Sequence, residues 1–374
     1  MRRTSAIWFI VLTLLATGVW IYLGKESIRK PPASEAQEGS HEKQATQTAL
    51  STKTPDTPLS LPDFIARCVN NLRNGNFVEG EIEALRQRLL SAPPDESVAA
   101  IQAFLATGRD AFTGEGFAVL NGGGLGGAPT MRILLLDMLG RICQQHDRPE
   151  AVQQAKTLLE RKTSADEWAV ALRNVGWGDP NAKPYLASKM REMLSEQAWR
   201  QQPSEGYLEA FDVIVFTRDA QFVDDLAEMI AQEKGPLKRA SAVALDRLSA
   251  QAPLDVMTRL NSNPKELADR PFLRADYFAK ADLSQTAQLA AVETYLDRQD
   301  VALGEKTKFF KAIIAPGEFV SDNLLTPAVP PEDSPQRAQI LQQTVQQWQK
   351  NNRFPELRPA LDLLGARLGN KPAR

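Results

Sequence analysis

The sequence predicts an all-α protein whose helical body follows one N-terminal transmembrane helix and a disordered linker. An uncharged apolar run lies close to the N-terminus, and a polar stretch poor in large apolar residues follows it. Apolar residues then recur at every third or fourth position through most of the remaining chain. No set of alternating strands separated by hairpin turns is recognisable, which argues against a sheet protein.

The composition supports a folded body and excludes several protein classes. The chain has 374 residues, of which 43% are hydrophobic, enough to bury a substantial core. Because 44 Lys and Arg stand against 46 Asp and Glu, nucleic acid is not an expected partner. A small basic cluster of Lys238, Arg239 and Arg247 is offset by Asp246 and Glu233. Two Cys and two His exclude disulfide-dense and zinc-cluster folds.

Residues 6–24 form the predicted transmembrane signal anchor, after a short tail at 1–5. The uncharged run AIWFIVLTLLATGVWIYL would cover roughly 27 Å as a helix, close to the thickness of the bilayer hydrocarbon. Trp8 lies near one end, and Trp20 and Tyr22 lie near the other. Aromatic rings favour the two membrane interfaces, so this pattern favours a spanning helix over a buried core helix.

A cleaved signal peptide is the alternative interpretation of the same run. Ala16-Thr17-Gly18 resembles a small-residue cleavage site, but the apolar residues 19–23 continue beyond it. We therefore expect a retained anchor in the inner membrane. A tail of five residues is easily left in the cytoplasm, which places the body in a bacterial periplasm. Basic residues flank both ends of the run, so a cytoplasmic body is the other orientation.

Residues 25–61 form the predicted disordered linker. Pro, Ser, Ala, Glu, Gln, Thr and Lys dominate this stretch, and large apolar residues are scarce before Leu50. Such a composition cannot bury enough surface to offset the entropy of ordering the chain. A flexible segment of this length reaches on the order of 30 Å, so we expect the body to work at some distance from the bilayer.

Residues 62–370 form the predicted helical body. Apolar residues repeat with helical spacing, and Pro, Gly, Asn or Asp separate the helical segments. Short connections favour antiparallel neighbours, arranged as a bundle or as stacked pairs. The segments expected to be helical are 82–90, 98–105, 131–142, 151–159, 167–175, 185–194, 207–215, 222–230, 237–248, 256–260, 289–296, 306–314, 340–348 and 357–368.

Three segments share a pattern: a proline, an early basic residue and a later Leu-Asp-x-Leu. The first runs from Pro129 to Leu139, the second from Pro236 to Leu248 and the third from Pro355 to Leu364. This pattern resembles the second helix of HEAT or armadillo-type repeats, which carry two or three helices per roughly 40 to 47 residues. The resemblance implies an α-solenoid with an extended concave surface.

A glycine-rich insertion at 108–129 is the part of the body that resembles a solenoid least. Asn121, Gly122, Gly123, Gly124, Gly126 and Gly127 directly precede a strongly apolar helix. Backbone N–H groups of such a loop can bind an anion at a helix N-terminus, which makes these residues a candidate ligand or partner loop. No P-loop ending and no preceding parallel strand accompany it. The simpler interpretation is a flexible surface loop or a tight backbone crossing.

The Cys and His residues do not form a recognisable metal site. Cys143 and His146 lie three residues apart, but His41 is in the linker and Cys68 is distant in sequence. A structural zinc site needs four ligands, so His146 is interpreted as a cation at a helix C-terminus. In an exported body, Cys68 and Cys143 are candidates for a disulfide that closes a loop of about 75 residues. Two buried thiols are the alternative.

The function predicted from these features is an interaction scaffold. An anchor, a spacer and a helical array without a recognisable catalytic or cofactor-binding set indicate a membrane-tethered protein that binds another envelope protein or peptide. No cofactor and no catalytic residue are expected. One alternative is an enzyme or small-ligand binder that uses the insertion at 108–129. Another is a helical bundle with a purely structural role.

Overall fold

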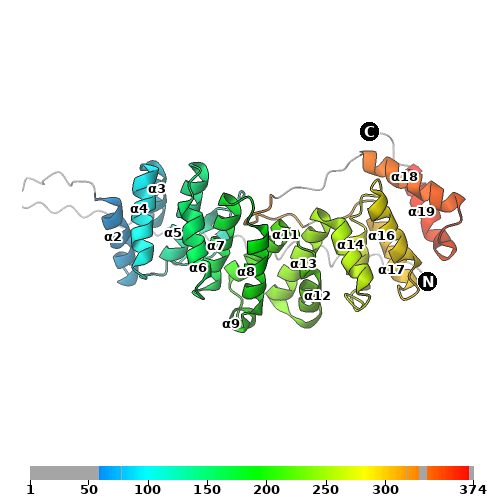
Figure 1. The fold of residues 1–374 in the computed structure, drawn as a ribbon, viewed down its shortest axis with the longest axis horizontal. Coiled ribbons are helices and arrows are strands. Elements are labelled where there is room, and N and C mark those ends of the chain that lie inside the picture. The colour runs from blue at the N-terminus through cyan, green and yellow to red at the C-terminus, as the bar shows by residue number, and fades with distance from the viewer. Residues whose placement is uncertain (1–58, 77, 318, 328–334, 370–374) are drawn as a thin grey trace, which may run out of the picture. The chain divides into compact units, whose positions relative to one another are not determined.

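A computed structural model describes residues 59–76, 78–317, 319–327 and 335–369, all within one compact unit that begins at Pro58 (Figure 1). This part of the chain is all-α apart from one small hairpin, as predicted. The expected anchor at 6–24 and almost all of the expected linker at 25–61 lie outside the described residues. Within the described ranges, no helix has the length and apolar character needed to cross a bilayer.

Most helices follow one another with short connections, and the long ones are residues 107–130 and 313–334. The helices are α2 (Leu61–Arg73), α3 (Glu81–Ser91), α4 (Pro94–Ala106), α5 (Met131–Gln145), α6 (Glu150–Leu159), α7 (Ala165–Gly178), α8 (Lys183–Ser195), α9 (Gln197–Gln201), α10 (Glu205–Glu209), α11 (Phe211–Thr217), α12 (Phe222–Gln232), α13 (Gly235–Gln251), α14 (Pro253–Ser262), α15 (Pro271–Phe278), α16 (Thr286–Asp297), α17 (Leu303–Ala312), α18 (Pro335–Lys350) and α19 (Arg358–Gly369), with the 3-10 helix η1 (Pro355–Leu357) before α19.

Most predicted helical segments lie inside these helices, and the differences are local. Segment 207–215 is divided between α10 and α11, and the segment predicted at 306–314 ends two residues early. Helices α2, α9 and α15 were not among the predicted segments. The two-stranded antiparallel sheet of β1 (Ala118–Val119) and β2 (Leu125–Gly127) was not predicted either.

Each helix packs mainly on helices close to it in the chain. One row, named row 1 here, consists of α5, α7, α10 with α11, α13, α15, α17 and α19, and its members contact the next member along the chain. Other helices cover the row: α6 packs on α7, α12 on α13, and α18 on α19. Packing between near neighbours in sequence is typical of helical-repeat proteins.

Buried ion pairs join successive helices of row 1. Asp137 of α5 and Arg173 of α7 are 2.5 Å apart, with both side chains fully buried. Arg247 of α13 lies 2.8 Å from Asp212 of α11. Because an isolated buried charge is strongly unfavourable, each pair fixes the position of its two helices relative to one another.

A third pair joins the C-terminal half of row 1. The guanidinium of Arg274 in α15 lies 2.7 Å from Glu305 in α17, and the hydroxyl of Tyr295 donates to the same carboxylate at 3.0 Å. The ring of Tyr295 stacks on Phe278 with centroids 4.0 Å apart and lies edge-on to Phe309. Polar and aromatic contacts therefore hold α15, α16 and α17 together.

The repeated Leu-Asp-x-Leu segments all lie in row 1, but their aspartates differ in surroundings. Asp137 is buried against Arg173, and Asp246 is buried 2.8 Å from Lys280. Asp362 in α19 is exposed and pairs with Arg358 of its own helix. Asp137 thus pairs with the next helix of row 1, and Asp246 pairs with the turn that follows α15.

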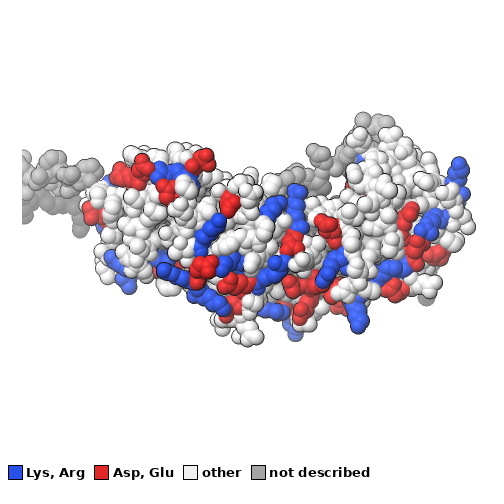
Figure 2. All heavy atoms as spheres, in the orientation of Figure 1, with Lys and Arg blue, Asp and Glu red and all other residues white. Residues whose placement is uncertain are grey.

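The charged surface has mixed sign. On the face shown in Figure 2, Lys and Arg side chains alternate with Asp and Glu, and no large patch of one sign gathers there. This face therefore gives no electrostatic reason to expect a polyanion as partner.

Replacing Glu305 by alanine should destabilise the protein by about 3–5 kcal/mol, because Arg274 would remain buried without its partner. Replacing the exposed Asp362 by alanine removes a surface pair and should cost no more than about 0.5 kcal/mol. Urea unfolding followed by far-UV circular dichroism measures both changes. Equal losses in the two variants would contradict the stabilising role given to the buried pair.

Candidate functional site

The candidate ligand loop is the turn of a small hairpin. Residues 120–124 connect β1 to β2, and Ala118 pairs with Gly127 in the antiparallel register. Gly122 and Gly123 have φ of +88° and +83°, a backbone region that residues with a side chain rarely adopt. Two of the glycines in the insertion are therefore required by the shape of the turn.

Several polar backbone groups of the hairpin are bonded inside the body. The N–H of Leu125 donates to Asp137 Oδ1 at 3.1 Å, and Arg173 donates to the carbonyl of Gly123 at 2.8 Å. Arg86 of α3 donates to the carbonyl of Gly126 at 3.1 Å. Helix α5 begins at Met131, beyond the hairpin, and its N-cap is Thr130. Hydrogen bonds with side chains of α3, α5 and α7 thus fix the hairpin in the fold.

Arg173 is the centre of this arrangement. Its guanidinium donates to Asp137, to the carbonyl of Gly123 and to Asn174 Oδ1, and it lies 4.1 Å from the ring centroid of Trp177. Burial lowers the pKa of Arg173, and the nearby Asp137 carboxylate opposes that effect. The hydrogen bonds compensate for the desolvation of the charge, so one side chain fixes both the hairpin and the α5–α7 contact.

Residues 319–327, named the return segment here, are a second polypeptide element on row 1. They follow α17 in the chain, yet they contact α7, α11 and α13 (Figure 1). The backbone N–H groups of Leu325 and Thr326 both donate to Asp212 Oδ2, at 2.7 and 2.9 Å. The N–H of Phe319 donates to Asp246 Oδ2 at 3.3 Å. Two buried aspartates of row 1 therefore bind main-chain groups of this segment.

Arg247 completes the contact between the return segment and row 1. Besides Asp212, its guanidinium donates to Asn323 Oδ1 and to Thr326 Oγ1. Arg247, Asn323 and Thr326 are all buried. The predicted basic cluster of Lys238, Arg239 and Arg247 is thus divided, because Arg247 is an interior residue.

Glycines leave the space that the return segment occupies. A Cβ atom on Gly123 would lie 2.1 Å from the carbonyl oxygen of Leu324 and 3.1 Å from the ring of Trp177. A Cβ atom on Gly176 would lie 2.7 Å from a methyl group of Leu325. The hairpin and α7 therefore approach the return segment more closely than any side chain would allow.

A cavity of about 300 Å³ lies beside the return segment, between α10, α11 and α13. Phe211, Val215 and Val243 contribute apolar lining, and Ser321 and Asn323 of the return segment also line it. Its charged lining includes Glu209 and Arg239, neither of which forms an ion pair with another residue in the part of the chain that the structure describes. Burial raises the pKa of Glu209, and nearby acidic side chains add to the effect.

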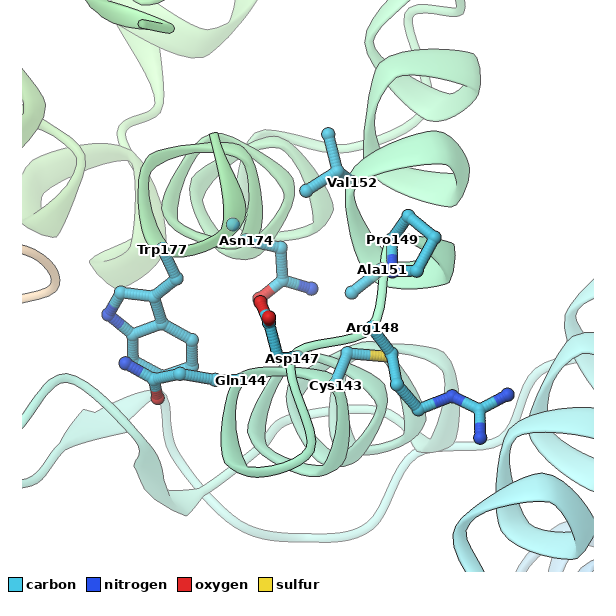
Figure 3. Close-up of a pocket in the computed structure, with 11 residues that line it drawn as sticks. Cys143, Gln144, Asp147, Arg148, Pro149, Ala151, Val152, Asn174 and Trp177 are labelled. Carbon is cyan, nitrogen blue, oxygen red and sulfur yellow. The ribbon is translucent and has the colours of Figure 1, made fainter. Parts of the chain in front are cut away.

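A smaller cavity of about 170 Å³ lies where α5 ends and α6 begins (Figure 3). Cys143, Asn174 and Trp177 line it, together with Asp147 in the turn after α5. Figure 3 shows the Arg148 guanidinium pointing away from the other lining side chains, and this group pairs with Asp95 at 2.5 Å. Among the other lining residues, Asn174 of α7 donates to the carbonyl of Leu136 in α5 at 3.0 Å.

Cys68 and Cys143 are free thiols buried in α2 and α5. Burial, with a smaller contribution from Glu81, raises the pKa of Cys68 to about 12. Burial also raises the pKa of Cys143. His146 is the exposed C-cap residue of α5, separate from the buried Cys143. Among the described residues, no three His, Cys, Asp or Glu side chains gather where they could hold a metal ion.

Arg173 and Arg247, each the centre of a buried polar cluster in row 1, were not identified as functional residues from the sequence. Their signal was present, since Arg173 and Arg247 occur in helices otherwise rich in buried apolar residues. A charged residue at a buried position requires a partner, which points to Asp137 and Asp212. The return segment left no comparable signal, because its sequence has no helical or strand period.

Replacing Gly123 by alanine should destabilise the protein by about 2–5 kcal/mol, because it adds a backbone clash with Leu324 to an unfavourable φ. Replacing Gly122 by alanine is the matched control, since φ is also positive there and the added Cβ meets nothing within 4 Å. We expect the control to lose only about 1–2 kcal/mol in urea unfolding. If the losses are the same, close packing of the return segment on the hairpin is refuted.

Both thiols should be unreactive in the folded protein. With a pKa of about 12, the thiolate fraction of Cys68 at pH 8 is about one part in 10,000. We expect no reaction with Ellman's reagent under native conditions and reaction of two thiols per chain in denaturant. Detection of one disulfide per chain by mass measurement without reductant would instead support the paired alternative for Cys68 and Cys143.

Comparisons of the chain with protein-family models, curated proteins and solved structures give no match. The helical architecture is compatible with a helical-repeat fold, and the resemblance to HEAT or armadillo repeats remains a prediction.

Proposed function

We propose that the protein is a single-pass, membrane-tethered interaction scaffold of the bacterial cell envelope. In this proposal residues 6–24 anchor the chain in the inner membrane, and residues 25–61 allow the body to reach away from it. The body, a helical-repeat domain of the HEAT or armadillo kind, lies in the periplasm and binds a segment of another envelope protein.

The observation that carries the proposal is the cavity between α10, α11 and α13. Its volume of about 300 Å³ accommodates one or two apolar side chains of a partner. Glu209 and Arg239 at its lining have no ion-pair partner among the described residues, so they are free to orient a charged ligand group. Apolar lining with a few polar groups that fix orientation is typical of binding sites.

The partner expected from this chemistry is an extended protein segment with an apolar residue next to an acidic one. The apolar side chain would enter the cavity, and the acidic group would pair with the exposed Arg239. The packing of row 1 supports this role, because stacked helices offer a long surface rather than an enclosed reaction site.

Site-specific photo-crosslinking in intact cells tests the proposal. Benzoylphenylalanine at Val243, which lines the cavity, should crosslink to an envelope protein. The same group at Thr258, exposed on α14, is the control and should not give that adduct. Substitution Arg239→Glu should lower the yield at Val243, because an acidic partner group would then be repelled.

The proposal requires that the crosslinked peptide carry an apolar residue beside an acidic one, as identified by mass spectrometry. An adduct equally strong at Val243 and Thr258, or one unaffected by Arg239→Glu, would contradict it.

A further inference from the structure

The return segment makes an excursion that the connection from α17 to α18 does not require. Helices α17 and α19 pack on one another, α18 packs on α19, and the rings of Phe310 and Trp348 are 6.3 Å apart. A short loop would therefore join α17 to α18, as most connections of about 4–6 residues do. Residues 313–334 instead separate the two helices, and 319–327 lie on α7, α11 and α13.

The contacts of the return segment have the form of peptide recognition. Asp212 accepts hydrogen bonds from two successive backbone N–H groups, those of Leu325 and Thr326. Asp246 accepts a third from Phe319. Carboxylates that bind main-chain N–H groups recognise a turn of polypeptide whatever its side chains are, in the manner of a helix cap.

Side chains add sequence preference to that turn. Arg247 donates to Asn323 Oδ1, and the hydroxyl of Thr326 donates to Asp212 Oδ1. The amide of Asn323 also donates to the carbonyl of Ser321, which closes the turn on itself. An Asn three residues before a Thr is therefore matched to the spacing of Arg247 and Asp212.

Leu324 and Leu325, which lie between Asn323 and Thr326, pack against glycine residues. Leu324 is fully buried, with its carbonyl against Gly123, and the side chain of Leu325 lies against Gly176. The start of the segment is less engaged, since Phe319 and Val320 are 51% and 54% exposed. The segment is thus held through a short turn rather than along its whole length.

We propose that the return segment is a resident ligand of the face formed by α7, α11 and α13. Its removal would open the surface beside the cavity. A partner would then place a turn with the order Asn-Leu-Leu-Thr on this surface, next to the extended apolar and acidic stretch that enters the cavity. This inference rests on the proposed scaffold function and names the polypeptide class that the face recognises. The return segment limits access of a partner to the face formed by α7, α11 and α13, because that face cannot bind a second turn while it is occupied.

The return segment belongs to the same chain as the face it occupies, so it competes intramolecularly with any free peptide. A ligand linked covalently to its binding site acts at an effective concentration on the order of 1 mM. A free peptide whose dissociation constant for the open face is about 10 µM would then bind the intact protein about 100-fold more weakly. If the return segment is a resident ligand, removing its binding residues should raise the affinity for a free peptide, whereas removing those of an inert loop should not.

The experiment uses a fluorescent peptide with the sequence of residues 319–327 and a variant that empties the face: Asn323→Gly, Leu324→Ser, Leu325→Gly and Thr326→Ser. We expect the peptide to bind the emptied full-length protein at least about tenfold more tightly than the intact protein. In the emptied background, Gly176→Ala should weaken binding at least about tenfold by blocking the place of Leu325. Gly304→Ala, where a new Cβ meets nothing within 4 Å, is the matched control and should not change the affinity.

Hydrogen exchange of the unaltered protein provides a second test that does not depend on the variant folding. Amides of Leu325 and Thr326 should exchange at least about 100-fold faster than that of Leu172 in α7, because the segment opens without unfolding the helices. Equal protection would overturn the proposal, since the segment would then be part of the cooperative core. Failure of the peptide to bind an emptied protein with native circular dichroism would also overturn it.

These experiments distinguish failure of this inference from failure of the scaffold proposal. A specific crosslink at Val243 that persists when the peptide fails to bind would refute only the resident-ligand role. Peptide binding without any partner crosslink would instead leave the face as an internal regulatory site and refute the scaffold proposal.

Discussion

The pairing of buried aspartates with buried arginines between successive helices of row 1 is the constraint on which the rest of this architecture depends. A buried carboxylate and a buried guanidinium must pair with good geometry, because either charge left unpaired in the interior is strongly destabilising. Asp137 with Arg173 sets the position of α5 against α7, and Asp212 with Arg247 sets α11 against α13. Apolar contacts tolerate some sliding of helices, whereas these pairs do not.

The same charged groups also hold the non-helical elements. Arg173 binds the hairpin through the carbonyl of Gly123, and Arg247 with Asp212 binds the return segment. The hairpin and the return segment then meet at Gly123 and Leu324. Polar side chains of row 1 thus bind backbone groups of both irregular elements, which offsets part of the cost of burying them.

The helices were predictable from the sequence, because the spacing of apolar residues is a local signal. The segment from Met131 to Ile142 is helical as predicted, and Pro236 and Pro253 lie in first helical turns. The hairpin was missed because Leu125-Gly126-Gly127 has little strand propensity, and its register is held by arginines from α3 and α7.

The candidate site was predictable only in part. None of the glycine-rich residues lines the cavity, and their one link to it is Gly123, which leaves room for Leu324 of the return segment. The return segment could not have been found, since its partners lie far away in the sequence and depend on the folded positions of α11 and α13. The sequence also groups Arg247 with the basic cluster of Lys238 and Arg239, because composition does not distinguish a solvated arginine from a buried one.

The excursion of the return segment has a consequence for how the chain assembles. Contacts between neighbouring helices span short stretches of sequence and form early, whereas long loops close slowly. The hydrogen bonds to Asp212 join residues 113 and 114 positions apart. During synthesis from the N-terminus, α11 and α13 emerge long before residues 319–327 exist. On the nascent chain, this polar face is therefore made before the segment that covers it in the finished protein.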